Sequence, residues 1–203
     1  MLTLYFYHDP MCSWCWGYRP TAELLFANLP ENISRENILG GLAPDSDEPM
    51  SAELLQKIPG HWQTIHEMLG TEFNFDFWTE CEPRRSTYPA CRAVIAATNQ
   101  ERQAEMTLAI QEAYYLRAMN PSDTNTLELL ATEIELDSRR FRSDLHSHET
   151  ESELQRQVAF ARSSPINGLP SLALGSGEQL TAVRLDYKDH EETLKHLAML
   201  MRQ

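Results

Sequence analysis

The chain has 203 residues, of which 42% are hydrophobic and 23% charged, and its formal net charge is −13 at pH 7. This length and apolar content allow one large domain, or a small domain that carries an insertion. The negative charge argues against nucleic acid as a partner, because phosphates would repel this surface. The sequence contains no run of 18 apolar residues, so neither a membrane-spanning helix nor a membrane partner is expected.

Residues 1–48 have the pattern of a strand, a helix and a second strand. Residues 2–8 (LTLYFYH) are apolar almost throughout, which is typical of a buried central strand. A helix is predicted from near Cys12 to Leu29, with a kink before Pro20, because proline removes a hydrogen bond to the preceding turn. A second strand is predicted within residues 33–42. Together these elements predict a βαβ unit.

Residues 49–162 have a helical pattern instead. Apolar residues recur at helical spacing at Ile58, Trp62, Ile65 and Leu69. We expect Pro59–Gly60 to mark a break at one end of that helix. The stretch FNFDFW (residues 73–78) alternates apolar and polar residues, which predicts an extended segment or a short strand. Further helices are predicted over residues 89–99, 101–119, 137–145 and 149–162. Another helix is predicted to begin at a capping box formed by Asn125 and Glu128.

Residues 163–203 return to a strand pattern and end in a helix. Two strands are predicted over residues 171–174 and 179–187, with a turn at residues 175–177 between them. A closing helix is predicted over residues 190–201. The whole order, βαβ, then helices, then ββα, predicts an α/β fold with a large all-helical insertion. We assign residues 1–48 and 163–203 to the α/β domain and residues 49–162 to the insertion.

The motif Cys12–Ser13–Trp14–Cys15 follows the first predicted strand. Cysteines at i and i+3 in the first turn of a helix project from one face, close enough for an unstrained disulfide. Cys12 would lie at the helix N-terminus, where free N–H groups stabilise a thiolate, and Cys15 one turn deeper. Thiol–disulfide exchange requires such an exposed attacking thiolate and a shielded resolving thiol. The motif therefore predicts a redox-active Cys12–Cys15 disulfide with no bound cofactor.

Two other interpretations of this cysteine pair carry less weight. A structural zinc site usually needs a second close pair, whereas Cys81 and Cys91 are separated by nine residues, so no metal site is predicted. An inert buried pair is the second alternative, because free cysteine packs like a small apolar residue, and Cys91 itself fits that description. Arg84 and Arg85 would lower the pKa of Cys81 if they folded back on it, or else are solvated charges.

Several features occur together along the chain: a strand–CxxC–helix opening with DPMCSWCWG at residues 9–17, Pro20, the helical insertion, and Gly168–Leu169–Pro170 before the ββα ending. In this combination the sequence resembles the DsbA family of the thioredoxin superfamily. It is most similar to the cytosolic DsbA-like dithiol–disulfide isomerases, which are related to 2-hydroxychromene-2-carboxylate isomerases and kappa-class glutathione transferases. The resemblance implies a thioredoxin fold around the helical insertion.

The same resemblance implies roles for the residues of the motif. Cys12 would be the nucleophile and Cys15 the resolving thiol. Ser13 and Trp14 would tune the redox potential. Trp14 would also offer an apolar platform to a peptide or to glutathione, whereas we expect Trp16 in the core, since tryptophan suits either place.

Outside the motif, the resemblance makes Pro170 a cis-proline packed against the disulfide. The backbone of Leu169 would then pair with an extended substrate, as an added strand does. Strongly oxidising family members carry an acidic residue six positions before the first cysteine, where this chain has Phe6. In place of that acidic residue, the sequence offers Asp9 or His8 as the proton acceptor for Cys15.

These features predict an enzyme, a thiol–disulfide oxidoreductase or isomerase. Its partners would be protein or peptide thiols and disulfides, or glutathione as co-substrate, and it would act as a monomer or homodimer. The N-terminus shows no basic, leucine-rich leader, which favours a cytoplasmic location. That location favours the reducing or isomerising half of the range of redox potentials from about −270 mV to −120 mV. The alternatives are a glutathione-dependent transferase or isomerase of the kappa type and a non-catalytic peptide-binding module.

Overall fold

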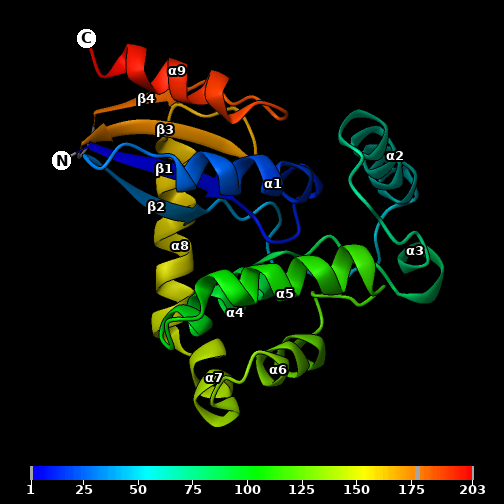
Figure 1. Cartoon of the computed structure of the whole chain (residues 1–203). Coiled ribbons are helices and arrows are strands. Elements are labelled where there is room, and N and C mark those ends of the chain that lie inside the picture. The colour runs from blue at the N-terminus through cyan, green and yellow to red at the C-terminus, as the bar shows by residue number, and fades with distance from the viewer. Residues whose placement is uncertain (1, 177–178, 203) are drawn as a thin grey trace.

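The computed structural model of the chain describes residues 2–176 and 179–202. Within these residues, the strands β1 (Leu2–His8), β2 (Ile33–Leu39), β3 (Ser171–Ser176) and β4 (Gln179–Val183) form one sheet in the order β2-β1-β3-β4. β1 runs parallel to β2, and β3 runs antiparallel to both β1 and β4. The predicted βαβ and ββα units therefore share one sheet, with β1 and β3 at its centre (Figure 1).

Two helices of these units cover one face of the sheet. They are α1 (Ser13–Ala27) and α9 (His190–Leu200), which pack against each other. Along β1, side chains alternate between the two faces of the sheet, as in any strand. Leu4 therefore packs with Leu25 of α1 and Leu197 of α9 in one buried cluster. On the other face, Tyr7 packs with Ala161.

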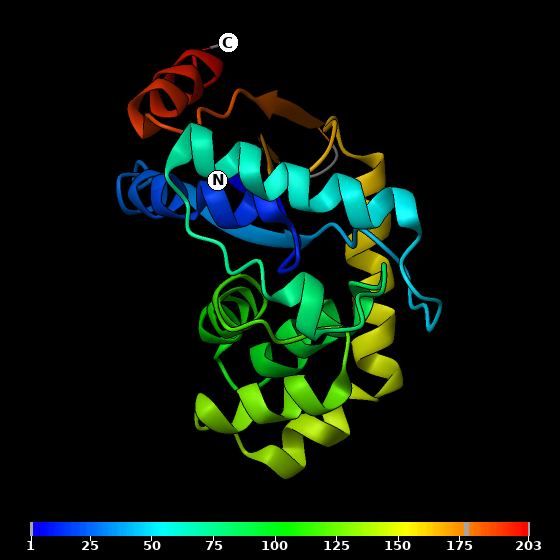
Figure 2. The ribbon, with the colours of Figure 1, turned by 90° about the vertical axis from the view of Figure 1, so that its right-hand side faces the viewer.

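The segment between the two units is helical, as predicted. Its helices are α2 (Ala52–Leu69), α3 (Phe77–Glu80), α4 (Tyr88–Thr98), α5 (Gln103–Leu116), α6 (Thr124–Glu133), α7 (Ser138–Leu145) and α8 (His148–Ser163). Figures 1 and 2 show α4 to α7 as a separate layer of helices, which α8 links to the sheet. α8 supplies Ala161 to the second face of the sheet, so this helix of the predicted insertion also covers the strands.

The helical segment departs from the sequence prediction in three places. α2 runs through Pro59–Gly60 without a break, because Trp62 and Ile65 anchor its inner face while its outer face is exposed to water, which can solvate the freed carbonyl. Residues 73–76 form no strand, and α3 begins at Phe77. The alternating aromatic residues of this stretch instead surround Trp62, whose ring lies 5.1 Å from Phe73 and 6.0 Å from Phe77.

The third departure concerns the predicted capping box at Asn125. α6 begins one residue earlier, at Thr124, with Asp123 as its N-cap residue and no side-chain capping bond. The Asp123 carboxylate forms an ion pair with Arg84 instead of accepting a hydrogen bond from the first turn of α6. The predicted turn at residues 175–177 falls partly on residues outside the described ranges, and β3 itself extends to Ser176.

Close contact between α1 and α2 depends on Gly17. A Cβ atom at this position would lie 2.6 Å from Cγ2 of the fully buried Ile65, and 3.0 Å from Cδ1 of Leu69. Both neighbours belong to α2, so the glycine sets how closely the CxxC helix approaches the helical segment.

We therefore predict that Gly17→Ala destabilises the protein although alanine is the better helix former. Overpacking costs about 1–3 kcal/mol, more than the gain of about 1 kcal/mol in helix propensity. Gly60→Ala is the matched control, because open space surrounds an added Cβ there, and it should stabilise by up to about 1 kcal/mol. Urea unfolding of both variants measures the difference, and equal effects of the two substitutions would contradict the prediction.

Candidate active site

Cys12 is the N-cap residue of α1. Its backbone is extended, and its sulfur accepts a hydrogen bond from the backbone N–H of Cys15 at 3.3 Å. The sulfur thus occupies the position in which a Ser, Asp or Asn oxygen usually satisfies the first turn of a helix. Negative charge on this sulfur is stabilised by that N–H and by the positive end of the helix dipole.

The loop before β3 lies against the same sulfur. The Leu169–Pro170 peptide bond is cis, and the Cys12 thiol donates to the Leu169 carbonyl at 3.5 Å. The pairing of β1 with β3 begins only at Ser171, so the backbone of Leu169 lies beyond the sheet ladder. Gly40 allows the close approach of Leu169, because a Cβ there would lie 2.7 Å from the leucine Cδ1. The structure therefore brings Cys12 and Leu169 together.

A groove of about 260 Å³ opens beside Cys12. We call it the Cys12 groove, and its walls are Met11, Cys12, Ser13, Trp14, Leu42, Leu54, Lys57, Ile58, His61, Arg85, Tyr114 and Leu169. Trp14 is half-buried there and meets the ring of Tyr187 edge to face at 5.3 Å. Pro170 is buried and lies outside these walls.

Sequence reasoning missed the basic side chains of the Cys12 groove. Lys57 and His61 come from α2, and Arg85 comes from the segment before α4. No aspartate or glutamate is among the lining residues, although the chain as a whole carries 30 acidic and 17 Lys and Arg residues. No local pattern identifies these residues, because the fold brings them to Cys12 from distant positions.

Cys15 lies behind Cys12 and is 3% exposed. Burial raises the pKa of its thiol well above the usual value, and the nearby Cys12 sulfur raises it further. Cys12 is itself only 5% exposed, so the expectation of an exposed attacking thiol was wrong. The two sulfurs differ in surroundings instead: Cys12 faces the groove, and Cys15 faces a different pocket.

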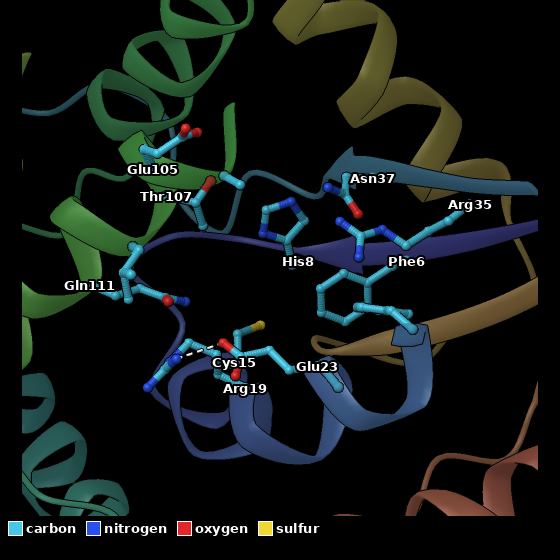
Figure 3. Close-up of a pocket in the computed structure, with 14 residues that line it drawn as sticks. Phe6, His8, Cys15, Arg19, Glu23, Arg35, Asn37, Glu105, Thr107 and Gln111 are labelled. Atoms are coloured by element: carbon cyan, nitrogen blue, oxygen red, sulfur yellow. Dashed lines mark hydrogen bonds and ion pairs between the residues drawn. The ribbon is translucent and has the colours of Figure 1, made fainter. Parts of the chain in front are cut away.

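We call this second cavity the Cys15 pocket (Figure 3). It has a volume of about 330 Å³ and lies between β1, β2, α1 and α5. It is lined by Phe6, His8, Cys15, Arg19, Ala22, Glu23, Phe26, Arg35, Asn37, Ala104, Glu105, Thr107, Leu108 and Gln111. Most of these residues carried no signal in the sequence, because four separate elements contribute them.

Asp9 is fully buried beneath the motif. Its Oδ1 accepts from the Met11 N–H at 2.8 Å, and its Oδ2 accepts from the Leu42 N–H at 2.8 Å and the Thr87 hydroxyl at 2.7 Å. The Cys91 thiol also lies 3.5 Å from Oδ2. Burial raises the pKa of the Asp9 carboxyl, and these donors oppose the shift. The carboxylate is therefore engaged in holding three segments together.

His8, the other predicted proton acceptor, is 4% exposed and lines the Cys15 pocket. Its ring stacks on Phe6 at 5.2 Å, and its Nε2 has no hydrogen-bond partner within the described residues. Burial, reinforced by the positive charge of Arg35, lowers the pKa of His8 to about 4. The imidazole is therefore neutral at physiological pH.

The remaining predicted residues lie in the core or at its edge. Trp16 packs in the core as expected, stacked on Tyr115 at 5.7 Å. Cys91 is completely buried, as expected for an inert thiol. Burial and nearby carboxylates raise the pKa of Cys81, and Arg84 pairs with Asp123, so of the two alternatives for Arg84 and Arg85 the one in which they lower this pKa does not hold. All four cysteines lie within the described residues, and none is bridged.

A βαβ–ββα sheet with a CxxC motif at the start of its first helix defines a protein with the thioredoxin fold. A family model described as Thioredoxin matches residues 5–190, and the chain belongs to this family. In the part of the chain that the structure describes, no helix is long and apolar enough to span a membrane.

Solved structures with the same architecture support this assignment. A candidate protein disulfide isomerase from Nitrosomonas europaea is 26% identical, with 100% of this chain and 98% of that chain covered and a TM-score of 0.86. The cytosolic disulfide reductase DsbM from Pseudomonas aeruginosa is 21% identical, with 98% of each chain covered and a TM-score of 0.76.

The curated relatives carry a different name. The ClpXP adapter protein SpxH from Bacillus subtilis is 27% identical over 174 residues, which cover 84% of this chain and 57% of SpxH. The SpxH of Halalkalibacterium halodurans is 24% identical over 176 residues. The chain thus spans little more than half the length of the curated relatives that it matches.

The depressed pKa of His8 predicts a specific acid sensitivity. Between about pH 6.5 and pH 4 the unfolded chain binds a proton at His8 that the folded protein does not, so stability falls as the pH falls. From pH 7 to pH 5 this residue should cost about 2 kcal/mol. His8→Asn should abolish that part of the pH dependence, as measured by urea unfolding at both pH values. Identical pH dependence in the variant and the wild type would show the prediction to be wrong.

Proposed function

We propose that the protein is a thiol–disulfide oxidoreductase that acts through Cys12 and Cys15. One observation carries the proposal: the Cys12 sulfur lies at a helix N-terminus, between the Cys15 N–H and the Leu169 carbonyl, on the wall of an open groove. A thiolate stabilised in this way is a good nucleophile and a good leaving group. Membership of the thioredoxin family supports the same activity.

In the reducing direction, the Cys12 thiolate attacks one sulfur of a substrate disulfide. The disulfide bond breaks, a mixed disulfide to Cys12 forms, and the other substrate sulfur leaves as a thiolate that takes a proton from water. The Cys15 sulfur then attacks Cys12 and releases the second substrate thiol. The substrate gains two electrons, and the protein is left with a Cys12–Cys15 disulfide. The exchange is reversible, so the same groups can oxidise or isomerise.

Substrate contacts follow from the walls of the Cys12 groove. An extended peptide can pair with the backbone at Leu169, which lies outside the β1–β3 ladder, while Trp14 offers an apolar surface. Lys57, His61 and Arg85 make this site basic in a strongly acidic protein. We therefore infer a preference for anionic thiols and disulfides, such as acidic cysteine peptides or glutathione. DsbM, which has a similar fold, was solved with GSH.

A redox titration tests the proposed activity. The protein is equilibrated in glutathione buffers, quenched with acid and alkylated, and free thiols are counted by mass. We expect one reversible two-electron transition, with a midpoint between about −270 mV and −120 mV. It should vanish in Cys12→Ser and in Cys15→Ser and persist in Cys81→Ser, the matched control. The absence of a transition in the wild type would refute the proposal.

The charge preference is tested separately, with acidic and basic peptide disulfides of equal length. In Lys57→Gln/Arg85→Gln, kcat/KM for the acidic peptide should fall by about tenfold, because local positive charge raises the encounter rate of anions. The effect should shrink at high salt. Lys195→Gln removes a similar charge on α9, far along the chain from the groove, and should change nothing. Equal losses with acidic and basic peptides would contradict the inferred preference.

A second candidate function is that of an adapter that binds another protein without redox chemistry. It is favoured by the curated relatives, which are named ClpXP adapters. An adapter would keep its function in the Cys12→Ser/Cys15→Ser double variant and would show no redox transition. Turnover with glutathione that survives in the same variant would instead indicate a transferase or isomerase of the kappa type.

A further inference from the structure

The Cys15 pocket has an apolar part that the proposed redox chemistry leaves unused. Phe6 of β1 and Phe26 of α1 meet edge to face there, with ring centroids 5.2 Å apart. Ala22 and Leu108 extend this part of the wall. The pocket volume of about 330 Å³ lies within the range of about 300–1,000 Å³ that is usual for cavities holding small organic molecules. Burial of an apolar molecule against these side chains would be favourable.

Arg35 gives the pocket a positive charge. Its guanidinium carbon lies 4.1 Å from the centre of the Phe26 ring, and partial burial lowers its pKa from the usual value. In the described part of the chain, Arg35 forms no ion pair. Side chains alternate along β2, so the neighbouring Glu36 points to the opposite face of the sheet, where its charge acts on Tyr7. The guanidinium therefore lacks a carboxylate partner.

The acidic residues of the lining do not serve as that partner, because each already has one. Glu23 pairs with Arg19 at 2.6 Å, and Glu105 pairs with Arg102 at 3.0 Å. Arg35 is the basic residue of the lining that these pairs leave over. A partly desolvated guanidinium gains most from an anion that it can hydrogen-bond in two places at once, and a carboxylate is such an anion.

Two deeply buried polar side chains reach into the same space without partners. His8 and Gln111 are each 4% exposed, and no hydrogen bond joins either side chain to another described residue. Asn37 Oδ1 and His8 Nε2 are buried atoms without a partner in the same part of the chain. Figure 3 shows the His8 ring and the Gln111 side chain extending from β1 and α5 into the space between these elements and α1. Buried polar groups are normally hydrogen-bonded, so these side chains offer donors and acceptors to a molecule in the pocket.

We propose that the Cys15 pocket binds a small organic carboxylate with an aromatic or branched aliphatic body. The carboxylate pairs with Arg35, and the apolar body packs against the two phenylalanine rings. His8 and Gln111 hydrogen-bond the polar substituents of the ligand. Such a ligand exchanges no electrons with the dithiol, so the site goes beyond the proposed oxidoreductase activity and can exist without it.

Neither water nor an inorganic anion matches this combination of walls. Water would satisfy the polar atoms of His8 and Gln111, but it gains nothing against the phenyl rings and brings no charge to Arg35. An inorganic anion would pair with Arg35 and leave the apolar part of the pocket empty. The Cys12 groove is a competing site, because it combines Trp14 with basic side chains, so the experiment has to tell the two cavities apart.

An NMR titration of the reduced, isotope-labelled full chain tests the site with 3-phenylpropionate. We expect saturable binding of a single molecule with a Kd of about 1 mM or tighter, which is ordinary for a ligand of this size. Acetate lacks the apolar body and 3-phenylpropionamide lacks the charge, so each should bind about tenfold more weakly or worse. The absence of saturation up to about 10 mM, or equal affinity for the amide, would overturn the proposal.

Two arginine variants show which cavity holds 3-phenylpropionate. Arg35→Gln should weaken binding by about tenfold, because it removes the charge and its paired hydrogen bonds. Arg85→Gln removes a comparable charge from the Cys12 groove and should leave this affinity unchanged. Unchanged affinity in Arg35→Gln would overturn the site, and a loss in Arg85→Gln alone would place the molecule in the Cys12 groove instead.

A steric variant tests the position of the site without altering a charge. Ala104 of α5 lines the pocket and is exposed, so Ala104→Trp should block the mouth and abolish binding while the core stays intact. Ala27→Trp adds the same bulk at an exposed position of α1 outside the lining, and it should bind as the wild type does. Full binding in Ala104→Trp would refute the site, and circular dichroism checks that both variants fold. The redox transition of the wild type is measured on its own, so its absence would refute the oxidoreductase function and leave this binding result standing.

Discussion

The buried carboxylate of Asp9 is the interaction on which the rest of the site depends. Its oxygens accept hydrogen bonds from the loop before α1, from the segment after β2 and from the residue that precedes α4, through Met11, Leu42 and Thr87. A buried carboxylate is costly unless it is fully hydrogen-bonded, so these three segments are held in fixed relative positions. The start of the CxxC helix is thereby tied to both the sheet and the helical segment.

This arrangement gives the two cysteines different surroundings although they lie three residues apart. α2 contributes the basic wall of the Cys12 groove, and α5 contributes one wall of the Cys15 pocket. The helical segment thus shapes both sides of the dithiol. Since both sulfurs are nearly buried, reactivity depends on which cavity each one faces and on which donors surround it, rather than on exposure.

The sequence was sufficient where structure is local. β1, α1 and the CxxC motif follow from short-range patterns, and so do the ββα ending and most helix positions. Prediction failed where tertiary packing overrides such patterns. α2 continues through Pro59 because Trp62 and Ile65 hold it, and the aromatic residues of 73–78 alternate because they surround Trp62 rather than because they form a strand.

The candidate site was predictable to the same extent. Cys12, Cys15 and the residues next to them could be found from the motif, and Leu169 from the resemblance. Lys57 and Arg85 could not, because their meeting with Cys12 is a long-range consequence of folding. The engagement of Asp9 by Thr87 is equally non-local, so the sequence left Asp9 and His8 as equivalent proton acceptors.

The position of α8 limits how far this protein can be treated as a set of modules. Ala161 of α8 packs on Tyr7, Ile38 and Ala173, which belong to three different strands. A shortened chain without the helical segment would expose that face of the sheet to water and lose the partners of its central strand. The helices between β2 and β3 are therefore part of the scaffold that makes the sheet stable. A transplant of the motif into another protein would have to include them.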